Sequence, residues 1–239
     1  PIDLGVLPEG FSGTIDIGEE PRPDTHLNVV ASHHNYESTP DAERIRSILG
    51  AMDSDISKGA FAVNRFTDLV SILDAARSMK KKHVILGMGG LGTVTRIRQP
   101  LLGNEFSFGY VGEPTAPGQL SVDEMSALGD DCMILGILGN PLSKSKSPRM
   151  QNAALDAAGI NGIYLPFEAP DLEQVEEVIR GYDIRGVNVT IPYKQEIMDH
   201  IDVVDKAASS IGAVNTVVNN NGRLEGYNTD VVGIDTALA

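Results

Sequence analysis

The sequence predicts an α/β protein in which helices cover largely parallel β-sheets. Short apolar runs alternate with segments of helical periodicity, and this alternation occurs twice along the chain, before and after a break near residue 130. The apolar runs are hydrophobic on both faces, which is typical of strands that helices cover on both sides. Clusters of Gly, Pro, Asn and Asp separate the runs, as expected of turns.

The composition is that of a globular protein large enough for two modest domains. The chain has 239 residues, of which 41% are hydrophobic and 22% charged. Its 19 basic and 33 acidic residues give a net charge of -14, which argues against nucleic acid as a partner because phosphate binding needs a concentrated basic surface. We therefore expect small-molecule ligands, and an anionic ligand requires a local group of Lys and Arg side chains.

Membrane, disulfide and metal functions are not expected from this sequence. No run approaches the ~18 consecutive apolar residues of a membrane helix, and the first residues, "PIDLGVLPEG", lack the basic and apolar regions of a signal peptide. The single cysteine, Cys132, excludes an internal disulfide and a site of several thiolates. We expect a cytoplasmic protein without a metal.

The first part of the chain reads as alternating strands and helices after a loop-like start. Residues 1–25 are rich in Gly, Pro and acidic residues and are expected to be loop without function. Strands are expected at 27–34, 55–63, 83–90 and 106–112, and helices at 40–52, 65–80 and 94–102. A weak helix and an acidic, Gly-containing joint follow at 119–132, so we divide the chain into domains 1–130 and 131–239.

The alternation restarts after this joint. Strands are expected at 133–139, 162–169 and 186–192, helices at 147–158, 171–182 and 202–212, a hairpin at 213–230, and the first turns of a helix at 231–239. Ser147 is the predicted N-cap of its helix, with Pro148 at the first helical position and Gly159 as the stop. Asn221-Gly222 predicts a type I′ turn in the hairpin.

One glycine motif suggests a dinucleotide site. "GMGGLG", Gly87 to Gly92, fits G-x-G-x-x-G after a strand, and Glu113 follows roughly 20 residues later after another strand. A Rossmann dehydrogenase that uses this motif is one alternative. Gly-rich loops between strands and helices are common, so the motif alone does not decide.

A lysine and a histidine pair are candidates for carbonyl chemistry. Lys58 lies on an otherwise apolar strand, where desolvation favours the neutral amine that attacks a ketone. The iminium formed in this way acidifies the neighbouring C–H, and His34 or His33 on an adjacent strand could remove that proton. The plainer alternatives are a solvated lysine at the rim and structural histidines.

Four stretches of the first domain resemble the type I 3-dehydroquinate dehydratases. They are "SHHNYESTP", "DISKGA", "GMGGLGTVTR" and "FGYVGEPTAPGQLSV", in the order of that family's later strands. The resemblance implies the C-terminal half of a (β/α)8 barrel in which Lys58 forms a Schiff base and His34 removes the substrate proton. It further implies that Arg96 binds the substrate carboxylate, with Thr115 and Gln119 on a closing loop. Thr115 stands where the family usually has Ser, and "KGAF" replaces a more aliphatic run.

Four stretches of the second domain resemble the substrate-binding domain of shikimate dehydrogenases. They are "GNPLSKSKSP", "GVNVTIPYK", "IGAVNT" and "GYNTD". The resemblance implies that Ser145 and Ser147 bind the substrate carboxylate, helped by the start of the helix that they open. It assigns Thr190 and Asn215 to ring hydroxyls, and Lys194 and Asp230 to proton transfer. Lys144, Lys146 and Arg149 form either a solvated basic patch or one that steers an anion.

Together the two resemblances imply an internal fragment of a fused two-enzyme protein of the shikimate pathway. The parent would dehydrate 3-dehydroquinate to 3-dehydroshikimate and reduce that product to shikimate with NADPH. Only about four barrel strands and no nucleotide domain are expected in this chain, so we expect the isolated fragment to be nearly inactive in both reactions. A noncatalytic module that binds quinate or shikimate is the second alternative. Retention of both a nucleophile and a proton relay argues against it.

Overall fold

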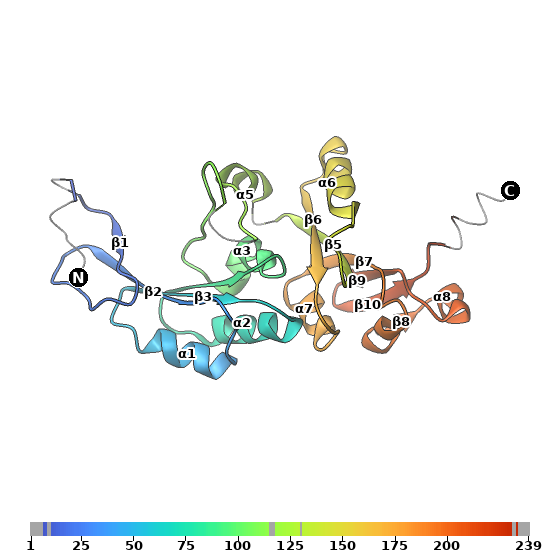
Figure 1. The fold of residues 1–239 in the computed structure, drawn as a ribbon, viewed down its shortest axis with the longest axis horizontal. Coiled ribbons are helices and arrows are strands. Elements are labelled where there is room, and N and C mark those ends of the chain that lie inside the picture. Colours follow the sequence, from blue (N-terminus) through green and yellow to red (C-terminus); the bar gives the residue numbers. More distant parts are fainter. Residues whose placement is uncertain (1–6, 9–10, 115–117, 130, 231–232, 234–239) are drawn as a thin grey trace.

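Two β-sheets lie side by side along the long axis of the molecule (Figure 1). The computed structural model describes residues 7–8, 11–114, 118–129, 131–230 and 233. The first sheet has four parallel strands in the order β1-β2-β3-β4. Their bounds are β1 (Thr14–Asp16), β2 (Asn28–Asn35), β3 (Ile56–Ala62) and β4 (His83–Met88).

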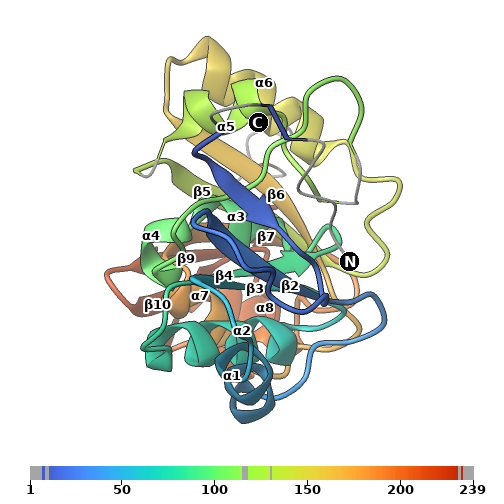
Figure 2. The ribbon, with the colours of Figure 1, turned by 90° about the vertical axis from the view of Figure 1, so that its left-hand side faces the viewer.

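Helices cover both faces of this first sheet. α1 (Ala42–Gly50) and α2 (Phe66–Ser78) lie on one face, and α3 (Thr93–Ile97) and α5 (Val122–Leu128) lie on the other (Figures 1 and 2). The short α4 (Gln99–Leu102) follows α3. α1 begins after Asp41, whose carboxylate accepts a hydrogen bond from the Arg44 N–H at 2.8 Å. The capping pair Ser121 and Glu124 starts α5.

The second sheet has six strands in the order β6-β5-β7-β9-β10-β8. β6, β5 and β7 are parallel, whereas β9 runs antiparallel to β7 and β10 antiparallel to β9. The strand bounds are β5 (Met133–Gly139), β6 (Gly162–Glu168), β7 (Ile184–Val189), β8 (Val203–Val204), β9 (Thr216–Asn220) and β10 (Arg223–Tyr227). The helices are α6 (Ser147–Ala157), α7 (Val175–Gly181), the 3-10 helix η2 (Glu196–His200) and α8 (Lys206–Ile211).

One hydrophobic core runs from the first sheet into the second. α2 packs against α7, and the buried Tyr182 hydroxyl donates to the Leu69 carbonyl at 2.8 Å. Arg98, at the junction of α3 and α4, donates to three backbone carbonyls: those of Tyr182 (3.0 Å), Cys132 (3.0 Å) and Asp183 (3.1 Å). This buried guanidinium therefore ties the helices beside the first sheet to the residues that precede β5 and β7 in the second sheet.

Three expectations about local structure were wrong. Residues 14–16 form β1 instead of loop, because they pair with β2. The run 106–112 forms no strand, and its Tyr110 makes only an isolated bridge to Ser121. α6 has Lys146 as its N-cap and Ser147 as its first residue, and the Ser145 hydroxyl accepts from the Ser147 N–H at 3.3 Å. The predicted hairpin turn is present, with φ of 53° at Asn221 and 91° at Gly222.

The described residues contain no helix with the length and apolarity to cross a membrane. In the same part of the chain, no group of three or more His, Cys, Asp or Glu side chains is placed to hold a metal ion.

Candidate active sites

The first candidate site is a cavity of about 380 Å³ over one face of the first sheet. In the register of the parallel strands, Ser32 is level with Lys58, and His34 is level with Ala60. Side chains alternate between the two faces of a strand, so these positions share a face. The side chains that line the cavity are His34, Tyr36, Lys58, Ala60, Leu86, Met88, Arg96, Phe108 and Gln119. Four residues predicted from sequence are therefore brought together here, and Thr115 lies outside the described residues.

Lys58 is held between a carboxylate and an aromatic ring. Its Nζ donates to Asp16 Oδ2 at 3.1 Å and lies 4.4 Å from the centre of the Phe108 ring. Asp16 also accepts from the Ser32 hydroxyl at 2.6 Å and from the Gly18 N–H at 3.0 Å. Burial raises the pKa of Asp16, but these hydrogen bonds and the charge of Lys58 outweigh it and leave the pKa below 3.8. The carboxylate thus stays ionised and orients the amine.

His34 and not His33 faces the cavity. Burial, and next the charge of Lys58, lowers the pKa of His34 below its ordinary value of 6.5. The neutral imidazole, which can accept a proton, is therefore favoured near neutral pH. The ring stacks on Tyr36 at 5.9 Å between centroids. His33 points elsewhere, with its Nδ1 2.7 Å from Glu19 Oε1.

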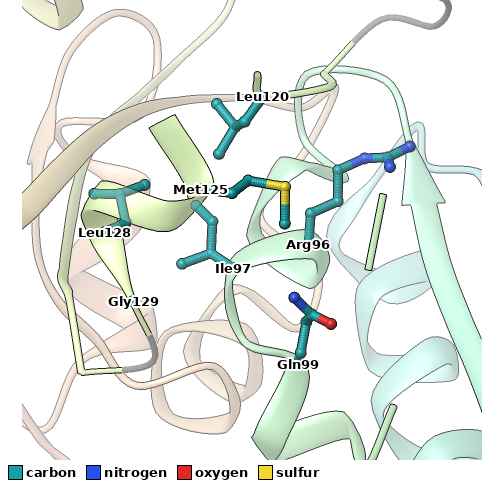
Figure 3. Close-up of a pocket in the computed structure, with 7 residues that line it drawn as sticks. All are labelled: Arg96, Ile97, Gln99, Leu120, Met125, Leu128 and Gly129. Atoms are coloured by element: carbon teal, nitrogen blue, oxygen red, sulfur yellow. The ribbon is translucent and has the colours of Figure 1, made fainter. Parts of the chain in front are cut away.

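Arg96 brings a buried positive charge to the same cavity. The residue is 3% exposed, and its guanidinium points away from α5 and its Leu128, as Figure 3 shows. Its Nη1 lies 3.5 Å from the Phe108 carbonyl, and its Nε has no hydrogen-bond partner among the described residues. Burial lowers the pKa of this guanidinium. A buried cation whose Nε is unpaired is costly unless an anion pairs with it, so this guanidinium is suited to an anionic ligand group.

The aliphatic part of Arg96 borders a second, small cavity. It has a volume of about 50 Å³ and lies between α3 and α5 (Figure 3). Its lining is mostly apolar, with Ile97, Leu120, Met125 and Leu128 around the arginine stem. This packing leaves only the guanidinium free to turn toward the larger cavity, and it links the position of Arg96 to that of α5.

The Gly-rich loop does not form a phosphate cradle. Gly87 lies within β4, and a Cβ placed on it would come within 2.9 Å of the Gly92 Cα. The N–H groups of Gly92 and Thr93 donate to the carbonyls of Gly89 and Gly90, and α3 has only five residues. The glycines serve close backbone packing, and these two N–H groups are used within the loop. This geometry disfavours the Rossmann interpretation.

The second candidate site lies at one edge of the second sheet. β5 and β7 are parallel, so the turn after Gly139, which carries Ser145, and the turn after Val189, which carries Thr190, leave at the same edge. β9 is antiparallel to β7, and therefore Asn215, just before β9, lies at this edge too. The end of β10 returns there and delivers residues 228–230. The topology thus collects all the second-domain residues predicted from sequence.

Lys194 and Asp230 are in direct contact at this edge. Lys194 Nζ donates to Asp230 Oδ2 at 2.8 Å. The hydrogen bond from Lys194 is the main reason that the pKa of Asp230 lies below 3.8, and a second hydrogen bond from the Asn215 side chain adds to it against the effect of burial. Asn215 is itself buried and bonded to Thr229. A lysine held beside an ionised carboxylate is suited to giving or taking a proton at a bound hydroxyl.

The carboxylate-binding residues expected near α6 lie at the start of that helix. Ser145 and Ser147 are half-buried, and Thr190 is fixed by a hydrogen bond from its N–H to the Leu138 carbonyl at 2.9 Å. Lys144, Lys146 and Arg149 are exposed around them. No contact in the described residues joins the two serines to Lys194, so their role in this site stays a prediction.

Asp16 is the site residue that sequence reasoning missed. It lies in the stretch expected to be loop, 42 residues before Lys58. The signal that could have found it is the short run "TID" before the strand that contains the histidines. Parallel neighbouring strands end at the same edge of a sheet, so the Asp at the end of this run lies near the polar residues of the next strand. Phe108 was also missed as a side chain over Lys58.

Two family models match successive parts of the chain. Residues 16–129 match "Type I 3-dehydroquinase", and residues 137–217 match "Shikimate dehydrogenase substrate binding domain". These ranges contain the two sets of site residues described above, except Asp230, which follows the second range.

Proteins similar to this chain are named either as both dehydroquinate dehydratase and shikimate dehydrogenase or as shikimate dehydrogenase alone. The chain is 32% identical, over 99% of its length, to the bifunctional 3-dehydroquinate dehydratase/shikimate dehydrogenase (chloroplastic) of Arabidopsis thaliana, and spans 41% of that protein. It is 50% identical over 44% of its length to a shikimate dehydrogenase (NADP(+)) of Halothermothrix orenii, of which it covers 37%. The solved dehydroquinate dehydratase and shikimate dehydrogenase of S. pombe AroM matches 89% of this chain and 44% of its own, at 26% identity and a TM-score of 0.43. The chain therefore spans about two fifths of the length of these relatives.

Proposed function

We propose that this chain is part of a two-enzyme protein of the shikimate pathway. Residues 16–129 match the type I 3-dehydroquinase family, and residues 137–217 match the shikimate dehydrogenase substrate-binding family. The first site dehydrates 3-dehydroquinate to 3-dehydroshikimate, and the second interconverts 3-dehydroshikimate and shikimate. The observation that carries this proposal is one cavity holding an amine, an imidazole and a buried guanidinium whose Nε lacks a partner among the described residues.

Two domains with a boundary near residue 130 divide these functions. In this proposal residues 1–130 are the C-terminal half of a (β/α)8 barrel, supported by four parallel strands joined through helices. Residues 131–239 form the substrate-binding domain of the dehydrogenase, supported by the mixed sheet that collects Lys194 and Asp230 at one edge.

The first reaction uses Lys58 as nucleophile. Its amine attacks the ketone carbon of 3-dehydroquinate and, with loss of water, forms an iminium. The iminium acidifies the adjacent C–H; the neutral His34 takes that proton and gives it to the ring hydroxyl, which leaves as water. Hydrolysis of the iminium then frees the product and Lys58. Arg96 pairs with the substrate carboxylate, and Gln119 contacts the substrate beside it. Thr115, which lies outside the described residues, keeps its predicted role as a further substrate contact.

The second reaction passes a proton at the alcohol that becomes a ketone. Lys194 exchanges this proton with the substrate oxygen, and Asp230 keeps the ammonium in place. Ser145 and Ser147 bind the carboxylate, and Thr190 and Asn215 contact ring hydroxyls. We propose NADPH as the hydride donor. The Gly87–Gly92 loop does not fit a nucleotide, because the N–H groups of Gly92 and Thr93 are bonded to carbonyls of the loop and the helix that follows has only five residues, and we assign no nucleotide contact to the described residues.

Calorimetric titration tests the two sites separately. We expect 3-dehydroquinate to bind the first site and shikimate to bind the second. Arg96→Met should weaken only 3-dehydroquinate, and Lys194→Met only shikimate, whereas the exposed Arg44→Met should change neither. Binding of neither ligand to the unaltered chain, or loss of both ligands in either variant, would overturn the proposal.

A further inference from the structure

A row of hydrogen-bonded side chains crosses the second sheet and ends at Asn215 and Thr229, next to Asp230 of the Lys194–Asp230 pair. It begins at the edge strand β6, where the Tyr164 hydroxyl donates to Asn188 Oδ1 at 2.7 Å. Asn188 Nδ2 donates to Thr216 Oγ1 at 3.4 Å. The Thr216 hydroxyl donates to Asn215 Oδ1 at 2.9 Å, and Asn215 Nδ2 donates to Thr229 Oγ1 at 3.0 Å.

The strand order places these groups in one line. β6, β5, β7 and β9 are successive neighbours, and Asn188 on β7 is level with Thr216 on β9. Tyr164 is 4% exposed and reaches past β5 to Asn188. Burial raises the pKa of Tyr164 to about 12, so its hydroxyl keeps its proton and remains a donor at every pH near neutrality.

The row has a direction. An amide side chain presents an acceptor oxygen at one end and a donor NH₂ at the other, so turning it by 180° exchanges the two. Because Tyr164 donates, Asn188 must present its oxygen to β6 and its NH₂ to Thr216. Thr216 then donates onward, which requires Asn215 to present its oxygen to Thr216 and its NH₂ to Thr229 Oγ1.

We propose that Tyr164 is a positioning residue for the proton-transfer pair of the second site: its hydroxyl fixes the orientation of Asn188 and, through Thr216, that of Asn215, which is bonded to Thr229 next to Asp230. This inference rests on the proposed function of that site. Tyr164 does not contact the reacting atoms and acts only through this row.

The effect of Tyr164 is partial, because Asn215 has further restraints. The backbone N–H of Thr229 donates to Asn215 Oδ1 at 3.0 Å. The Thr229 hydroxyl donates to the same oxygen at 3.2 Å, so loss of the Tyr164 hydroxyl loosens one of three hydrogen bonds to Asn215 Oδ1. One hydrogen bond contributes enough to change shikimate affinity by about 3- to 10-fold.

Two substitutions interrupt the row at different links, and a third is the matched control. Tyr164→Phe and Thr216→Val each remove one hydroxyl and keep the shape of the side chain. Tyr182→Phe also removes a buried hydroxyl, whose partner is the Leu69 carbonyl, outside the row. The measurements are shikimate affinity by calorimetry and the titration of the Asp230 carboxyl carbon by NMR.

The expected result is a rise in the Asp230 pKa and an affinity loss of about 3- to 10-fold in both row variants, with neither change in Tyr182→Phe. The double variant should lose little more than either single variant, because both break one row. Unchanged Asp230 titration together with affinity within about twofold of the unaltered chain overturns the positioning role, whichever of the two row variants folds.

The two proposals fail in different ways. A chain that does not bind shikimate, but whose Asp230 titration still responds to Tyr164→Phe, refutes the proposed function and supports the row. A chain that binds shikimate equally with and without the two hydroxyls, with Asp230 unaltered, refutes the row and leaves the proposed function standing.

Discussion

Replacing Arg96 by methionine should stabilise the ligand-free protein and remove its affinity for 3-dehydroquinate. Arg96 as a whole residue is 3% exposed, and its Nε has no partner among the described residues. Its contact with the Phe108 carbonyl, at 3.5 Å, is at the limit of a hydrogen bond. Methionine keeps the unbranched stem that borders the small cavity against Met125 and Leu128, and it removes the charge.

The expected changes in stability and in binding follow from the poor pairing of the Arg96 charge in the ligand-free protein. Replacing a buried, poorly paired charge by an apolar side chain of similar size stabilises a protein by about 1–4 kcal/mol. Removing the cation that pairs with a buried carboxylate ligand costs roughly 2–5 kcal/mol of binding energy, which corresponds to a loss of at least about 30-fold in affinity. Stability and binding should therefore change in opposite directions.

Urea unfolding and calorimetric titration with 3-dehydroquinate measure the two effects. Arg44→Met, on the exposed face of α1, is the control and should shift the free energy of unfolding by no more than about 0.5 kcal/mol. The reasoning is refuted when Arg96→Met lowers the free energy of unfolding by more than about 1 kcal/mol or when the variant binds 3-dehydroquinate as the unaltered chain does.

Two further predictions concern stability. Arg98→Met should lower the free energy of unfolding in urea by about 3–5 kcal/mol, because it leaves three backbone carbonyls at the linkage without their donor; a change below about 1 kcal/mol would contradict that role. The pKa of Asp16 lies below 3.8 in the folded protein, so its contribution to stability is present above that value and is lost as the pH falls through the folded pKa. In Asp16→Asn, the free energy of unfolding from circular-dichroism curves should fall less steeply as the pH is lowered. An unaltered pH slope would show that Asp16 does not cause the loss of stability.

Local sequence patterns predicted the elements that local interactions determine. The strand at 133–139 and the stop at Gly159 come from an apolar run and from a glycine with φ of 64°, and both are present. β1 was missed because three residues become a strand only by pairing with β2. The run 106–112 was overpredicted for the converse reason, since its apolar residues find no strand partner beyond one bridge.

The site residues were likewise predicted where they lie in a local motif and missed where they do not. Lys194 and Asp230, 36 residues apart, were predicted because each lies in a motif of a known family, and they are in contact at 2.8 Å. Asp16 contacts Lys58 from 42 residues away and lies in no such motif. The hydrogen-bonded row from Tyr164 to Thr229 depends on strand order and register, which no single segment encodes.

Borohydride reduction in the presence of 3-dehydroquinate, followed by peptide mass spectrometry, tests the central claim most directly. The claim is that Lys58, held by Asp16 in a cavity with His34 and Arg96, is an amine placed to attack the carbonyl of an acid that Arg96 binds. We predict a stable adduct on Lys58 that is lost in Lys58→Met and strongly reduced in Arg96→Met. An adduct spread over the exposed lysines, or none at all on Lys58 while 3-dehydroquinate binds, would contradict the account.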